Sequence, residues 1–146
     1  MPRYRASWLL PMLVAIAGSA RADYVMLPFR AVIAETTSIV DATVVEHGEN
    51  GSIGIVVQQV LKGDSPPTTL GGAWRTCLGI DISEILKLDT RYVFLLYRTG
   101  LYEENSFYET EERAGVLFCK CWDGTTRRWM PILEFRRLVD EAQANP

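Results

Sequence analysis

The sequence is poor in the residues on which most enzyme active sites depend. It contains one histidine, His47, and three cysteines among 146 residues. Nucleophilic catalysis of the triad type needs a base that a third group orients, and a single histidine beside a turn would have to supply all of that chemistry. Glutamates gather between residues 99 and 112, but the ligand spacing of a calcium loop is absent. We therefore expect a protein that is not an enzyme and that has no cofactor.

Basic residues are also scarce. The chain has 15 Lys and Arg against 18 Asp and Glu, which gives a net charge of −3. The pairs Arg127-Arg128 and Arg136-Arg137 are too short to follow a phosphate backbone. An acidic chain without a basic run is not expected to bind nucleic acid or anionic lipid through its charge.

Long hydrophobic runs are absent after the first 22 residues. Arg3 and Arg5 precede a short apolar stretch, Trp8 to Ala17, and Ala20-Arg21-Ala22 follows it directly before Asp23. A basic start, a short apolar middle and a small-residue exit are typical of a cleavable secretory signal, and ten apolar residues are too few to cross a bilayer. We predict a signal peptide at residues 1–22 and one secreted or periplasmic domain at 23–146, without stable membrane insertion.

The three cysteines are interpreted in the light of that export. A disulfide persists outside the cytosol, so Cys77 is predicted to pair with either Cys119 or Cys121, leaving one thiol. A direct Cys119–Cys121 bridge is disfavoured, because residues two apart on a strand place their Cα atoms about 6.5–7 Å apart, at the limit of disulfide geometry. The alternative is a copper or zinc site, or a redox module, built from the three cysteines with His47.

Periodicity predicts a helix, then antiparallel strands. A helix of about three turns is expected from Phe29, and residues 36–40, which are mostly β-branched, are expected to turn into a strand. Strands 39–47 and 53–61 form a predicted hairpin around Asn50-Gly51, and a less regular strand follows at 68–77. The segment 91–98 is apolar on both faces, which is typical of a strand that is covered on both sides.

The second half is predicted to contain a polar loop, a hairpin and a helix. Residues 99–112 are expected to be the loop, and strand 114–122 is expected to return through Asp123-Gly124 into 127–130. An amphipathic helix follows Pro131, with Phe135, Leu138, Val139 and Ala142 on its apolar face. The whole is one mainly β (α+β) domain.

Aromatic residues in this half suggest binding surfaces. Tyr102, Phe107 and Tyr108 alternate with the glutamates of the expected loop, a composition suited to contact with a protein partner. Trp122 and Trp129 flank the last hairpin, where they either pack across it or line a groove for carbohydrate or peptide.

Three strings carry a resemblance to a known family: Ile39-Val40-Asp41-Ala42-Thr43-Val44-Val45, Val57-Gln58-Gln59-Val60-Leu61-Lys62-Gly63 and Leu88-Asp89-Thr90-Arg91-Tyr92-Val93-Phe94-Leu95-Leu96. With the order of elements, they resemble the tissue-inhibitor-of-metalloproteinases and netrin-module family of secreted OB-fold proteins, in its small bacterial form. The resemblance implies a small OB-like antiparallel β-barrel with an N-terminal and a C-terminal helix.

The family's inhibitory function does not transfer to this chain. Its inhibitors chelate a protease zinc through an N-terminal cysteine, whereas the predicted mature chain begins Asp23-Tyr24-Val25. We therefore expect a secreted, non-catalytic binding domain for an unidentified protein or ligand, with the cysteine-based metal or redox module as the alternative.

Overall fold

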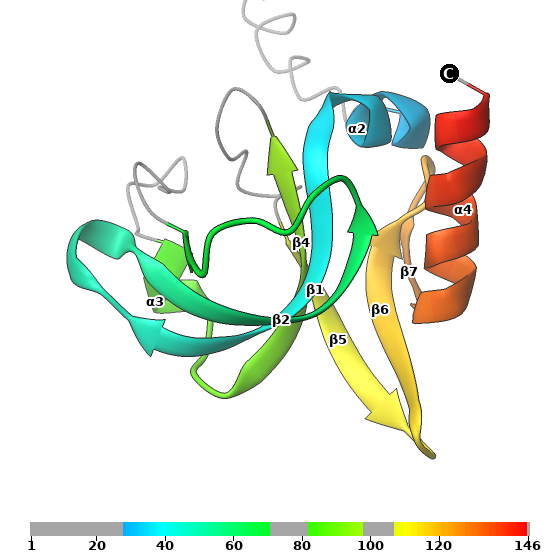
Figure 1. Ribbon diagram of the computed structural model, residues 1–146. Helices are drawn as coiled ribbons and strands as arrows, with labels where there is room; N and C mark the ends of the chain where they lie inside the picture. The colour runs from blue at the N-terminus through cyan, green and yellow to red at the C-terminus, as the bar shows by residue number, and fades with distance from the viewer. Residues whose placement is uncertain (1–27, 71–81, 98–106, 146) are drawn as a thin grey trace, which may run out of the picture.

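The computed structural model describes residues 28–70, 82–97 and 107–145 (Figure 1). The expected signal peptide, Cys77 and Tyr102 lie outside these residues. The elements are α2 (Phe29–Glu35), β1 (Thr36–His47), a 3-10 turn (Glu49–Gly51), β2 (Ile53–Lys62), β3 (Thr69–Leu70), α3 (Ile82–Ile85), β4 (Thr90–Tyr97), β5 (Phe107–Arg113), β6 (Val116–Trp122), β7 (Arg127–Pro131) and α4 (Ile132–Ala144).

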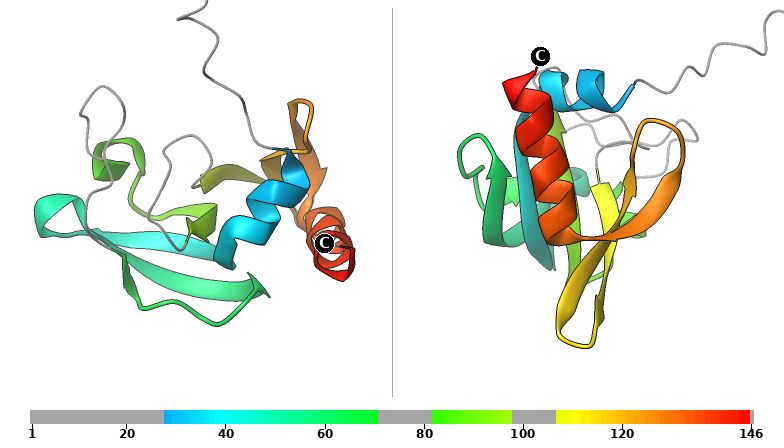
Figure 2. Two further views of the ribbon diagram at one scale, coloured as in Figure 1. Left: turned by 90° about the horizontal axis from the view of Figure 1, so that it is seen from above. Right: turned by 90° about the vertical axis from the view of Figure 1, so that its right-hand side faces the viewer.

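The strands form one curved antiparallel sheet in the order β3-β2-β1-β4-β5-β6-β7 (Figures 1 and 2). The mainly β, α+β class is confirmed. The expectation of a closed barrel is wrong for the described residues, because β3 and β7 remain separate edges of the sheet. Both edges offer little for strand pairing in the described residues: β3 pairs with β2 at only two positions, and β7 ends at Pro131, which has no backbone donor.

The first hairpin and the helix before it follow the local sequence. β1 pairs with β2 from His47↔Ile53 onward, as predicted, and Gly51 in the turn has a positive φ of 74°. α2 has two turns rather than three, and β1 begins at Thr36. The β-branched run therefore ends the helix earlier than its apolar spacing suggested.

The expected loop 99–112 is wrong from Phe107 onward, since β5 begins there and pairs with both β4 and β6. β5 turns into β6 through Ala114 and Gly115, which have positive φ values of 49° and 78°. Alanine rarely adopts this conformation, so Ala-Gly is a weak hairpin signal. The β6–β7 hairpin at Asp123-Gly124 is confirmed, with Trp122 opposite Arg127.

The core lies on both faces of the sheet, and β4 contributes to each. Val93 and Leu95 of β4 belong to the cluster that α2 and α4 cover, while Tyr92 and Phe94 belong to the cluster on the other face. The predicted burial of this strand on both faces is thus confirmed. Helices α2 and α4 lie side by side and contact each other through Phe29 and Phe135 (Figure 2).

Candidate functional site

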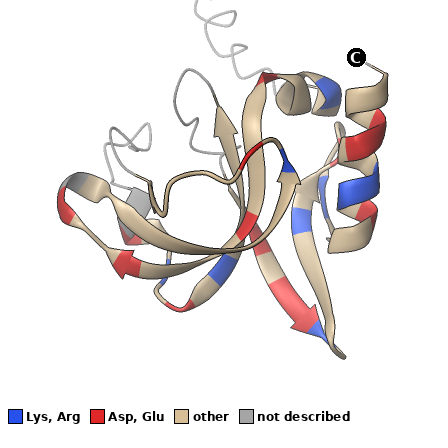
Figure 3. Cartoon of the chain, in the orientation of Figure 1, with Lys and Arg blue, Asp and Glu red and all other residues tan. Residues whose placement is uncertain are grey.

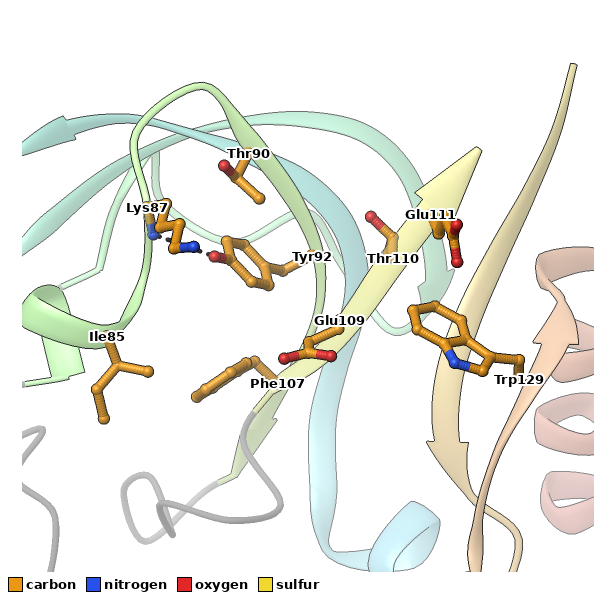
Figure 4. A pocket seen from close by; sticks show the side chains of 9 residues that line it. All are labelled: Ile85, Lys87, Thr90, Tyr92, Phe107, Glu109, Thr110, Glu111 and Trp129. Carbon is orange, nitrogen blue, oxygen red and sulfur yellow. Dashed lines mark hydrogen bonds between the residues drawn. The ribbon is translucent and has the colours of Figure 1, made fainter. Parts of the chain in front are cut away.

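A groove of about 350 Å³ opens between α3, β4, β5 and β7 (Figure 4). Alternation along β5 places Phe107, Glu109 and Glu111 on this face, whereas Tyr108 points to the opposite one and packs against Phe135 of α4. The groove therefore lies on the face of the sheet that α4 does not cover. Four separate segments of the chain supply its lining.

The aromatic wall of the groove is fixed by contacts within the protein. Tyr92 and Phe107 meet edge to face, with ring centroids 5.7 Å apart and an interplanar angle of 83°. The hydroxyl of Tyr92 accepts a hydrogen bond of 3.0 Å from the backbone N–H of Lys87. Trp129 of β7 adds a half-buried indole, and Ile85 is 43% exposed at the α3 end. An aromatic surface held in this way needs little ordering when a ligand binds.

The two glutamates of the groove differ in their partners. Arg113 donates to the Glu111 carboxylate from Nε at 3.2 Å and from Nη2 at 2.9 Å. Among the described residues, no ion pair or hydrogen bond involves the side chain of Glu109, which is exposed. Glu109 is therefore a carboxylate available to a ligand.

Cys119 and Cys121 lie on the opposite face of β6, fully buried in the core beneath α4, and both are free thiols. Cys77 lies outside the described residues, so the predicted bridge from Cys77 to one of these two cysteines lies outside them as well. A hydrogen bond with Cys121, together with burial, raises the pKa of the Cys119 thiol far above its ordinary value. The Cys119 thiol is therefore a poor nucleophile and a poor metal ligand, since both roles need the thiolate. Cys121 is fully buried beside it.

The alternative metal site is not assembled among the described residues. His47 is exposed at the end of the β1–β2 hairpin, where its Nε2 lies 2.7 Å from the carbonyl oxygen of Leu86. That hairpin end and β6 lie at opposite sides of the molecule (Figure 1). No group of three or more metal-ligating side chains occurs in residues 28–70, 82–97 and 107–145.

We expect the two buried thiols to resist alkylation in the folded protein. In a Cys77→Ser variant they are the only thiols, and iodoacetamide at pH 8 should modify neither until the protein is unfolded. Intact-mass spectrometry before and after denaturation in urea measures this. Two adducts gained within minutes in the native state would show that the thiols are accessible, contrary to the structure.

The predicted contact surface is partly wrong. Tyr108 is 0% exposed and cannot contact a partner, because its ring is buried against Phe135 of α4. Phe107 does face solvent on the groove side. Of the two tryptophans, Trp122 packs into the core and Trp129 lines the groove. The two tryptophans are not opposite each other across the hairpin, since Trp122 pairs with Arg127 and Trp129 with Lys120, and a carbohydrate or peptide ligand at Trp129 stays a prediction.

Comparison of the chain with protein-family models, with curated proteins and with solved structures gives no match. The resemblance to the netrin-module family stays a prediction. Among the described helices, none is long and apolar enough to cross a membrane.

Sequence reasoning missed Tyr92, Lys87 and Glu109 as groove residues. The period-two pattern of Phe107, Glu109 and Glu111 was a usable signal, because it places one aromatic and two acids on one face of a strand. The glutamates around it favoured a loop instead.

Proposed function

We propose that this chain is a secreted, non-catalytic binding domain whose ligand site is the groove between α3, β4, β5 and β7. The proposal depends most on the aromatic lining of this groove: contacts within the fold hold Tyr92 and Phe107 in place, and Trp129 lines the same groove. Concave sites with apolar walls and a few polar groups are where proteins bind small molecules and peptide side chains.

The groove chemistry supports binding rather than catalysis. Hydrolysis with two carboxylates needs one acid and one base on either side of the scissile bond. Here Arg113 engages Glu111, which leaves Glu109 as the single carboxylate without an ion pair among the described lining residues, and those residues include no histidine, cysteine or serine. Export through the predicted signal peptide, residues 1–22, is part of the proposal and is supported by its composition.

The family relation is likewise proposed. The three strings that resemble the netrin-module family form β1, β2 and β4, which are neighbours in the order β2-β1-β4. Similarity is thus concentrated in one contiguous part of the sheet. A fold alone does not choose a function, so the binding role depends on the groove.

Titration of the ¹⁵N-labelled protein with a panel of small probes tests the proposal. The panel contains a neutral disaccharide and neutral, acidic and basic tripeptides. At least one probe should shift amide resonances at Tyr92, Phe107 and Trp129, and Trp129→Leu should weaken that binding about threefold or more, since an aromatic contact is lost. Leu133→Ser, which alters an exposed residue on α4, is the control and should leave binding unchanged. Shifts that cluster elsewhere, or none with any probe, would overturn the assignment.

A further inference from the structure

The groove face already holds one cation of the protein itself. The guanidinium of Arg113 lies 5.0 Å from the ring centroid of Phe118 and 5.3 Å from that of Trp129. Its counter-ion is Glu111, two residues earlier on β5. Aromatic rings attract a cation through their negative faces, and a carboxylate adds a charge-assisted hydrogen bond. This part of the sheet therefore stabilises a guanidinium by two rings and one carboxylate.

A similar set of groups lies one step along β5, next to the part of the strand that pairs with β4, and it shares Trp129 with the first position. Glu109 lies between the rings of Phe107 and Trp129 in Figure 4, and all three line the groove. No cation of the described residues forms an ion pair with Glu109. Acidic residues lie along β5, and the basic residue of this strand is at its C-terminal end (Figure 3). The second position thus has the rings and the carboxylate but takes no cation from these residues.

Two lysines lie near enough to affect this position. Lys87 lines the groove at the α3 end, and the ring of Tyr92 lies between it and Glu109 in Figure 4. Lys120 is half-buried on β6, directly opposite Trp129 on β7. An ion pair of Glu109 with either lysine is absent from the described residues.

We propose that the groove binds an arginine side chain of a peptide segment, with the guanidinium between Phe107 and Trp129 and Glu109 as its counter-ion. The inference rests on the proposed function. A planar guanidinium suits a site between rings better than a compact ammonium does, and Arg113 shows the arrangement within this chain. The net charge of −3 for the whole chain favours approach of a basic partner.

The test compares two peptides that differ in charge alone, Ac-Gly-Arg-Gly-NH₂ and its citrulline analogue. Citrulline keeps the shape of arginine without its charge. We expect the arginine peptide to bind the full chain with a Kd of about 1 mM, followed by the Trp129 indole and backbone resonances, and the citrulline peptide to bind at least about fivefold more weakly. Sodium chloride at 0.5 M should raise the Kd of the arginine peptide, because salt screens an exposed ion pair.

Variants of β5 and β6 locate the interaction. Glu109→Gln should raise the Kd of the arginine peptide about fivefold, while Glu112→Gln should change it less than about twofold. The two variants make the same charge change on the same strand, but Glu112 lies on the other face. Lys120→Gln removes a nearby cation and should tighten binding slightly. Unchanged thermal midpoints confirm that each variant is folded.

The outcomes separate this inference from the function on which it rests. Equal losses in Glu109→Gln and Glu112→Gln would show diffuse electrostatic attraction and overturn the arginine site. The arginine site would also be overturned if the disaccharide or the citrulline peptide bound in the groove as tightly as the arginine peptide. The proposed binding function would then still stand. Absence of groove shifts with every probe would overturn both.

Discussion

Replacing Arg91 with leucine is expected to lower the free energy of unfolding by about 3 kcal/mol, because it leaves the carboxylate of Asp41 buried without its counter-ion. Asp41 is 0% exposed in the middle of β1. Arg91 of β4 donates to it from Nε at 2.6 Å and from Nη2 at 2.5 Å. Gln59 of β2 adds one hydrogen bond of 2.9 Å, so a neutral amide would be the only remaining partner in the described residues.

The geometry explains why this ion pair differs from those on the surface. The bidentate pairing satisfies both oxygens of Asp41, and the hydrogen bond with Asp41 raises the pKa of Arg91 above its ordinary value. Arg91 therefore stays charged throughout the working pH range. When the arginine of such a pair is removed, the buried carboxylate stays charged without solvent or a counter-ion, and the protein loses stability. In an exposed pair, water solvates the remaining carboxylate, so the loss is small.

Two variants isolate this effect in urea unfolding followed by circular dichroism. Asp41→Asn in the Arg91→Leu background should recover more than half of the loss, because the buried charge is gone while an amide remains. Arg137→Leu makes the same substitution in the exposed pair with Glu141 and should cost less than about 0.5 kcal/mol. A loss in Arg91→Leu as small as in Arg137→Leu would mean that water reaches Asp41 in the folded protein.

The parts of the fold that could be predicted are those with short-range signals. Asn50-Gly51 and Asp123-Gly124 mark two hairpins, and the apolar spacing after Pro131 marks α4. β5 lacks such a turn signal, and the charges on residues 109–113 outweigh the period-two spacing of Phe107, Glu109 and Glu111, so the segment is assigned to a loop. This segment is a strand because it pairs with β4 on one side and β6 on the other, and such long-range pairing cannot be inferred from local composition.

The groove was less predictable than the fold. Phe107 and Trp129 were singled out for their aromatic side chains, but Tyr92 and Lys87 meet them only through the order of strands in the sheet. Asp41 shows a related limit. An acid inside the apolar run 39–45 signals a buried charge, yet its partner Arg91 lies 50 residues away, and only the β1–β4 register brings the two together.

A second large loss of stability, about 3 kcal/mol, is expected for Gly63→Ala, which adds strain at a left-handed residue and a backbone collision. Gly63 ends the Val60-Leu61-Lys62-Gly63 string and has a φ of +71°. A Cβ there would lie 2.1 Å from the carbonyl oxygen of Thr37, so the backbone of β1 or of the turn would have to move.

Movement at this point would break other contacts. The ammonium of Lys62 donates to the carbonyl oxygens of Ile33 and Thr36, where α2 ends and β1 begins. Ser38 donates a hydrogen bond of 2.7 Å to the carbonyl oxygen of Asp64, one residue beyond the glycine. The close approach of Gly63 thus holds the end of β2 against the α2–β1 junction.

Gly115→Ala separates the two causes. Gly115 has a similar φ of +78°, but its Cβ would meet no atom within 4 Å. Strain alone should cost about 1 kcal/mol there, a fall in Tm of a few degrees, against about three times as much at Gly63. Thermal unfolding of both variants decides the matter. Equal losses of stability in the two variants would mean that the positive φ alone causes the effect at Gly63. A small shift of the turn would then relieve the collision with Thr37 and leave the Lys62 contacts in place.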